Sequence, residues 1–166
     1  MTAFMGIDPG ASGALALYDA EANRIMKLYD MPTHTITVSG KKRKRIDQHA
    51  LDRFMEEFEA YWPRLLAIED VHSMPLQGVT SAFSFGKAAG CVEQAAVCHK
   101  LPISLVDPAA WKRAMGLTKD KDSCRRAASR LIPSAAHHWP LKGHDGRAEA
   151  AILAVYASRI YTTTFS

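Results

Sequence analysis

The chain has 166 residues, of which 48% are hydrophobic, so it is long enough to bury a sizeable core and suits one domain over residues 1–166. No apolar run approaches the roughly 18 residues of a membrane span, and nothing at the start resembles an export signal, so we expect a cytoplasmic protein with no membrane partner. Three cysteines without CxxC spacing exclude a disulfide framework or zinc site and predict small buried side chains, whereas the net charge of +4 mildly favours a polyanionic partner.

The hydrophobic pattern predicts an ordered series of strands and helices. Three short strands in hairpin succession imply an antiparallel meander, and two buried strands separated by helices follow them. Asp47 is the expected N-cap of the first helix. The expected strands cover residues 3–7, 14–18, 24–31, 64–71 and 101–107, and the expected helices cover 48–61, 76–99, 108–115, 121–131 and 144–160. This order is typical of an α/β ribonuclease H-like fold, a mixed five-stranded sheet with three antiparallel and then two parallel strands, flanked by helices.

Acidic residues stand at the ends of these elements. Asp8 follows the first apolar strand, and Glu69 and Asp70 close the fourth, where alternation allows only one of the two to face Asp8. Asp145 and Glu149 are four residues apart, so both lie on one face of the last helix. If that helix begins against the strand ends, the pattern predicts a carboxylate cluster.

A cluster of carboxylates is most simply balanced by a hard divalent cation with oxygen ligands. Two Mg²⁺ ions roughly 3.5–4 Å apart can activate a water and stabilise a leaving 3′-oxygen, which makes phosphodiester hydrolysis the implied reaction. Each acid also has an ordinary interpretation. Asp8 before Pro-Gly can form a turn, and Asp145 can stabilise a helix N-terminus.

The chain resembles the RuvC family of Holliday junction resolvases, in the compact form found in phages and prophages. "GIDPG" alone also resembles sugar kinases and actin-like ATPases, but those proteins need a second lobe. The resemblance rests on five motifs in the family's order: "GIDPGASGALALY", "LAIEDVHSM", "SAFSFGKAAGCVEQAA", "LPISLVDPAAWKRAMG" and "HDGRAEAAILA".

The resemblance implies a set of metal ligands. Asp8 and Glu69 match the strand ligands, and Asp145 and Glu149 match the acids of the last helix, with Mg²⁺ as the expected cofactor and Mn²⁺ as a substitute. The family usually places its two helix ligands three residues apart, either two acids or a His and an Asp. The expected order of importance here is therefore Glu149, then Asp145, then His144.

Three further positions match residues that relatives place near DNA. His72 occupies the position of an aromatic side chain near the crossover, where imidazole can stack on an unpaired base. Lys112 and Lys121 match basic positions near the scissile phosphate, and Lys121 is included among the catalytic candidates. The alternatives are an exposed loop histidine and two solvated helix lysines.

Residues 39–47, "SGKKRKRID", hold the clearest charge run of the chain. Five consecutive cations between a strand and a helix favour an arm that contacts DNA phosphates, with a solvated loop as the alternative. The cations are Lys41, Lys42, Arg43, Lys44 and Arg45.

The helix expected over residues 76–99 is apolar around more of its circumference than one core requires, and Gly86 and Gly90 allow close approach of a second backbone. Because relatives form dimers through this helix, a two-fold homodimer is expected. The resulting prediction is a Mg²⁺-dependent endonuclease that resolves four-way junctions in branched DNA by paired symmetric nicks. The alternatives are a broader fork and flap nuclease and a catalytically silent junction-binding protein.

Overall fold

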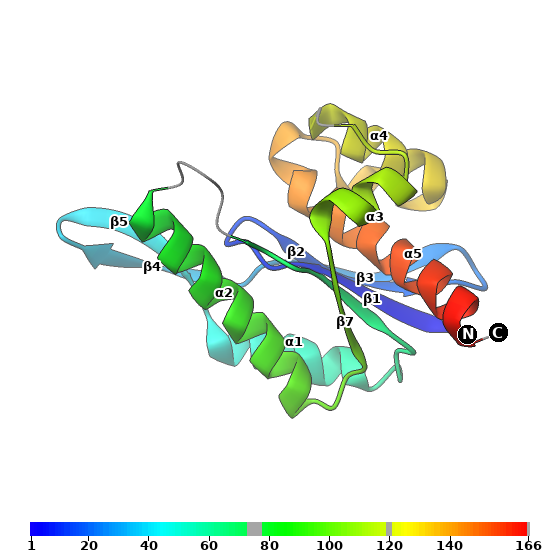
Figure 1. The fold of residues 1–166 in the computed structure, drawn as a ribbon, viewed down its shortest axis with the longest axis horizontal. Coiled ribbons are helices and arrows are strands. Elements are labelled where there is room, and N and C mark those ends of the chain that lie inside the picture. The colour runs from blue at the N-terminus through cyan, green and yellow to red at the C-terminus, as the bar shows by residue number, and fades with distance from the viewer. Residues whose placement is uncertain (73–77, 119–120, 166) are drawn as a thin grey trace.

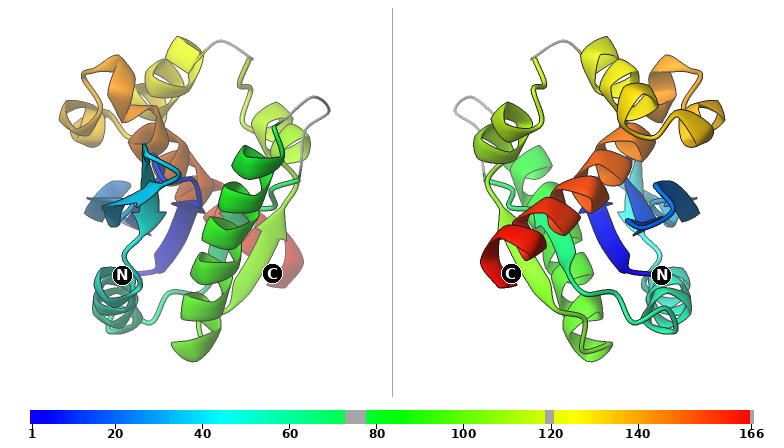
Figure 2. Two further views of the ribbon diagram at one scale, coloured as in Figure 1. Left: turned by 90° about the vertical axis from the view of Figure 1, so that its left-hand side faces the viewer. Right: turned by 90° about the vertical axis from the view of Figure 1, so that its right-hand side faces the viewer.

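The computed structural model describes residues 1–72, 78–118 and 121–165, without the side chains of Lys121 and Phe165. A five-stranded sheet separates two helical layers (Figures 1 and 2). Helices α1 (Gln48–Glu59) and α2 (Val79–Cys98) cover one face. Helices α4 (Lys121–Leu131) and α5 (Asp145–Phe165) cover the other, with α3 (Pro108–Ala114) at its edge.

The sheet has the order β3-β2-β1-β6-β7. The first three strands are antiparallel, and β6 and β7 continue the sheet in parallel. This confirms the predicted mixed sheet. The strands are β1 (Ala3–Asp8), β2 (Ala14–Asp19), β3 (Arg24–Asp30), β6 (Leu66–Glu69) and β7 (Ile103–Val106).

Two hydrophobic clusters form the core, one on each side of the sheet. Alternate residues of β1 and β2 point to opposite faces, so Met5 packs toward α1 and α2 whereas Phe4 packs toward α5. The central strands are buried on both faces, which explains why they appear in the sequence as continuous apolar runs.

Gly6 allows α5 to lie directly on β1. A Cβ at this position would come 2.2 Å from the carbonyl oxygen of Ala150 and 2.3 Å from the amide nitrogen of Ala154. Any side chain would therefore push α5 away from the sheet, and the acids at the start of that helix would move with it.

The helices follow the predicted pattern with small differences at their ends, and the predicted start of the second helix at residue 76 lies outside the described residues. Asp47 caps α1 by accepting a 3.0 Å hydrogen bond from the amide of Ala50, and α4 has the predicted bounds. Helix α5 extends beyond the predicted residue 160, and two short 3₁₀ segments, Pro133–His138 and Lys142–His144, were not predicted.

Residues 33–46 form a hairpin that the sequence did not reveal. Strands β4 (Thr33–Val38) and β5 (Lys41–Ile46) pair in a separate antiparallel sheet, where a loop arm was expected. The turn is made by Ser39 and Gly40, whose positive φ angles of 50° and 73° suit a two-residue hairpin turn. The cationic run carries no apolar alternation, so its strand character was hidden.

The cysteine prediction holds only in part. Cys124 is buried, Cys91 is partly buried and Cys98 is exposed. Cys98 is the last residue of α2, beyond the part of the helix that packs on the sheet, so the expectation of burial was wrong for it.

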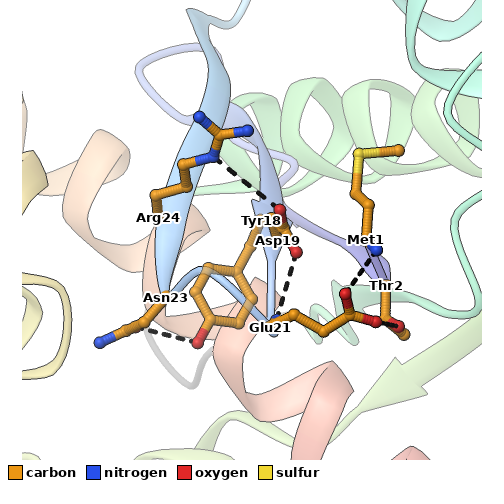
Figure 3. Close-up of polar contacts among 7 residues, drawn as sticks. All are labelled: Met1, Thr2, Tyr18, Asp19, Glu21, Asn23 and Arg24. Atoms are coloured by element: carbon orange, nitrogen blue, oxygen red, sulfur yellow. Dashed lines mark hydrogen bonds and ion pairs between the residues drawn. The ribbon is translucent and has the colours of Figure 1, made fainter.

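A network of polar contacts lies at the end of the sheet opposite Asp8, around the turn between β2 and β3 (Figure 3). Asp19, buried to 3% exposure, accepts a hydrogen bond from the amide of Glu21 and lies 3.8 Å from Arg24. The hydroxyl of Tyr18 donates to Asn23 across 3.0 Å. These contacts hold the turn between β2 and β3 in place.

Candidate active site

Asp8 stands where β1 ends and the loop to β2 begins. Its Oδ1 accepts a 3.1 Å hydrogen bond from the amide of Gly10, which fixes the carboxylate against its own turn. Burial raises the pKa of Asp8 to about 6, although the Gly10 bond opposes that shift. The acid that interrupts the apolar run is therefore largely withdrawn from water at the sheet edge.

Glu69 lies beside Asp8 because β1 and β6 are parallel neighbours with Ile7 opposite Ile68. The indole Nε1 of the fully buried Trp111 donates a 3.1 Å hydrogen bond to Glu69 Oε1. Trp111 comes from α3, which starts at the same edge because β7 pairs with β6. Sequence reasoning missed this contact, although the tryptophan is part of a motif that carried the family resemblance.

Glu149 reaches the edge from the second turn of α5. The helix docks closely because a Cβ at Gly146 would come 2.5 Å from the carbonyl oxygen of Ser12. Arg147 adds two 2.6 Å hydrogen bonds to the carboxylate of Asp30, at the end of β3. This bidentate pair, also missed from the sequence, fixes the start of α5 against the sheet.

Lys112 lies between two of the acids. Its Nζ is 3.3 Å from Glu69 Oε1 and 3.6 Å from Glu149 Oε2. Burial alone would lower the pKa of Lys112, but the carboxylates of Glu149 and Glu69 outweigh it, so the pKa is raised. The ammonium therefore balances part of the negative charge. From the sequence, only a phosphate contact was predicted for this residue.

Burial raises the pKa of Glu149 to about 7, with Asp8 and Glu69 adding to the shift and Lys112 opposing it. Asp8 and Glu149 thus both hold their protons more firmly than ordinary carboxyl groups. Such a cluster carries excess negative charge when it is fully ionised, which is the condition that a divalent cation relieves.

Asp145 has a different neighbour. Its Oδ1 is 3.1 Å from Arg125 Nε of α4, but off the geometry of a hydrogen bond, and both atoms are buried. His144 Nδ1 accepts a 3.4 Å hydrogen bond from the amide of Leu141 at the edge of the short 3₁₀ segment. The structure therefore brings Asp8, Glu69 and Glu149 to the same end of the sheet, with Lys112 between the two glutamates, and it pairs Asp145 with Arg125 of α4.

The donor set fits hard divalent cations because it consists of carboxylate oxygens, and Asp145 adds a buried oxygen that accepts no hydrogen bond in the described structure. As the side chains stand, no group of three or more His, Cys, Asp or Glu residues in the described ranges is arranged to hold a metal ion. The Lys112 ammonium lies between Glu69 and Glu149, where its positive charge competes with that of a metal ion for the same carboxylates.

Apart from Lys112, the predicted DNA contacts lie in three places. The five hairpin cations lie on β5, where four are exposed and Arg43 is partly buried. His72 is exposed, with Nε2 3.5 Å from Asp70, in the loop after β6. Lys121 begins α4, but its side chain lies outside the described part of the chain.

Helix α2 buries one face only. Ala88, Ala89, Val92 and Ala96 pack into the core. A second apolar stripe stays exposed, which rules out burial of the whole circumference within one chain. It consists of Val79 (86% exposed), Phe83 (71%), Gly86, Gly90 and Val97 (57%).

In the described ranges, no helix combines the length and the apolar character needed to cross a membrane.

Comparisons with known proteins agree with this architecture. The structure is similar to that of Thermus thermophilus RuvC in complex with a Holliday junction substrate, with a TM-score of 0.63 and 17% identity over 98% of each chain. A second Thermus thermophilus RuvC structure matches with a TM-score of 0.58 and 17% identity, over 97% of this chain and 98% of that one. Among curated proteins, none matches.

The family model for the crossover junction endodeoxyribonuclease RuvC matches residues 4–141. The match includes Asp8, Glu69 and Lys112 but stops before α5, the element in which the sequence departs from the usual acid spacing. Because the match covers well over half of the sequence, this chain belongs to the RuvC family of crossover junction endodeoxyribonucleases.

Proposed function

We propose that this chain is a metal-dependent endonuclease that resolves four-way DNA junctions by nicking two symmetric strands. The observation that carries the proposal is that Asp8, Glu69 and Glu149 lie together where β1 and β6 end, with Lys112 between the two glutamates. These three acids are called the acid edge below. Family membership and the similarity to a junction-bound RuvC support the choice of branched DNA as the substrate.

The residues divide the work in a defined way. Asp8, Glu69 and Glu149 would hold Mg²⁺, which Mn²⁺ can replace, and the bound ions supply water activation and charge stabilisation at the leaving oxygen. Trp111 fixes one oxygen of Glu69, and the Gly10 amide fixes one of Asp8. Glu149 must release the proton that its raised pKa retains, and Lys112 is placed to follow the phosphate charge. Direct ligation by Asp145 or His144 remains a prediction.

A homodimer supplies the second cutting site. Two copies that meet along the Gly86, Gly90 and Val97 part of the exposed stripe of α2 would cover surface that a monomer leaves in water. Gly86 and Gly90 leave room for the partner helix because no atom lies within 4 Å of a Cβ built on either. A two-fold assembly also matches the two equivalent strands of a junction. A nuclease of this kind would work in the cytoplasm of a bacterium or an infected host.

One assay tests the function. Mobile and immobile four-way junctions, forks, flaps and duplex are each incubated with the protein in Mg²⁺ or in EDTA. We expect paired nicks in both types of junction with Mg²⁺, and none in EDTA or with Asp8→Asn. Equal cutting of forks and flaps would favour the broader nuclease, and tight junction binding without cutting would indicate the silent binding protein.

A further inference from the structure

A groove of about 890 Å³ is lined by residues of the β4–β5 hairpin and of the N-terminal half of α2. Figure 1 shows where these two elements lie in the fold. Cα atoms of β5 and α2 approach within 8 Å of each other. Ala11 and Ser12, in the loop that follows Asp8, are also lining residues. The ring of Phe85 also packs near this loop, since a Cβ at Gly10 would lie 3.7 Å from it. The groove therefore leads to the acid edge.

Strand register divides the cationic run between two faces of the hairpin. Arg43 and Arg45 pair with Ile36 and His34, and these four side chains line the groove. Lys42 pairs with Thr37 on the opposite face. Of that opposite face, only Lys44 and Ile46 are among the described residues that reach the groove. The two faces are thus chemically different.

The groove combines positive charge with aromatic surface. Arg43, Arg45 and Lys87 supply cations, while Phe83 and Phe85 supply rings. The one acid among the described lining residues, Asp47, already caps α1. In addition, Arg43 Nε is buried and has no hydrogen-bond partner within the described structure. Cations beside rings are the composition of sites for unpaired nucleic acid, where phosphates meet the charges and bases stack.

The size of the groove selects among forms of DNA. Its volume is that of a small-molecule pocket, about 300–1,000 Å³, which holds a few nucleotides but no turn of duplex. We propose that the groove between the hairpin and α2 receives a short unpaired segment of the strand that enters the acid edge, while Lys41 and Lys42, which are not among its described lining residues, contact duplex phosphates outside. This inference rests on the proposed function and assigns a new site within it.

Native cysteines provide a direct test. Cys91 lines the groove, and Cys98 lies on the same helix outside it. The full-length Asp8→Asn protein in EDTA is alkylated with iodoacetamide, and each cysteine is followed by mass spectrometry. We expect a junction with unpaired thymidines at its branch point to slow alkylation of Cys91 about tenfold and to leave Cys98 unchanged. Unslowed Cys91 in a protein that visibly binds this junction would overturn the proposal.

Two matched variants test the division of the hairpin. Arg43→Gln with Arg45→Gln and Lys41→Gln with Lys42→Gln each remove two charges from one strand. We expect the first pair to weaken binding of a twelve-residue oligothymidine about tenfold and of duplex less than about threefold, and the second pair to do the reverse. Equal effects of the two pairs on both probes would refute the proposal, provided that both variants keep the parental melting temperature.

The proposed function and the groove assignment fail separately. If the parent protein neither binds nor cuts junctions, the proposed function is wrong. If it cuts junctions normally while oligothymidine leaves Cys91 unprotected and the two charge pairs behave alike, only the groove assignment is wrong, and its occupant is not nucleic acid.

Discussion

The acid edge and the basic hairpin are built in opposite ways. The acids stand on strands that are buried on both faces and on a helix that packs directly on β1, and Trp111, Gly10 and Lys112 fix their oxygens. The hairpin is a separate two-stranded sheet whose cations are mostly exposed. Hydrolysis requires groups placed to fractions of an ångström, whereas attraction of phosphates acts over about 10 Å at 0.1 M salt. Rigidity is accordingly concentrated where the chemistry needs it.

The largest expected effect comes from substitutions of the three acids alone. Asp8→Asn, Glu69→Gln or Glu149→Gln should lower single-turnover cleavage of a four-way junction about a thousandfold or more, because an amide keeps the shape but removes the charge that holds a cation. Junction binding in EDTA should stay within about threefold of the parent. A variant that cuts at the parental rate would remove its residue from the catalytic site.

The reciprocal change removes the positive charges of the hairpin and leaves the acids intact. Replacing Lys41 to Arg45 by serine should weaken binding to all DNA shapes, about a hundredfold at moderate salt, and flatten the slope of log K against log salt by up to about 0.9 for each phosphate that the hairpin no longer neutralises. Cleavage at saturating protein should fall far less than in the acid variants, because the acids themselves are unchanged. An unchanged salt slope would mean that the hairpin makes no phosphate contacts.

A third effect is a pH dependence that belongs to the acid edge. Asp8 and Glu149 have pKa values of about 6 and about 7 in the folded protein, above those of unfolded carboxyl groups. The metal-free folded state therefore binds more protons than the unfolded state between about pH 4 and pH 7, and these two groups reduce stability as the pH rises through that window.

The comparison of parent with Glu149→Gln reports the contribution of Glu149 together with its electrostatic coupling to Asp8, Glu69 and Lys112, since the remaining titrating groups are common to both. We expect the variant to gain about 2 kcal/mol of unfolding free energy relative to the parent between pH 5 and pH 8, measured by urea denaturation in EDTA. Adding Mg²⁺ at pH 8 should stabilise the parent more than the variant. Parallel pH profiles would show that burial of Glu149 carries no penalty.

The same contrast explains what the sequence could predict. Short apolar runs and their order along the chain sufficed for the sheet. Parallel pairing of β1 with β6 follows from that order and places Glu69 beside Asp8. The charge run could not be identified as a strand because lysine and arginine carry no apolar alternation. Its strand character depends on the turn at Ser39 and Gly40 and on the pairing with β4.

Long-range polar contacts were also beyond the sequence. Trp111 donates to an acid 42 positions away, and Arg147 binds one 117 positions away. Neither spacing follows from a helix or strand period. The position of Lys112 between two carboxylates likewise depends on where α3 and α5 meet the sheet, which no local pattern reveals.

The smallest expected effects concern the start of α5, where the acid edge meets α4. Asp145→Asn should slow cleavage about tenfold, less than Glu149→Gln, and His144→Ala should have the least effect.

The structure places Asp145 3.1 Å from Arg125, so Arg125→Gln should slow cleavage by a similar factor. The double variant of Asp145 and Arg125 should be no slower than either single variant. Single-turnover rates on one junction, in Mg²⁺ and in Mn²⁺, measure all five variants. If Arg125→Gln were silent while Mn²⁺ rescued Asp145→Asn, Asp145 would be a direct metal ligand, because Mn²⁺ accepts an amide more readily than Mg²⁺ does. Full activity of Glu149→Gln with loss of activity in His144→Ala would show that His144, and not Glu149, holds the metal ion at the start of α5.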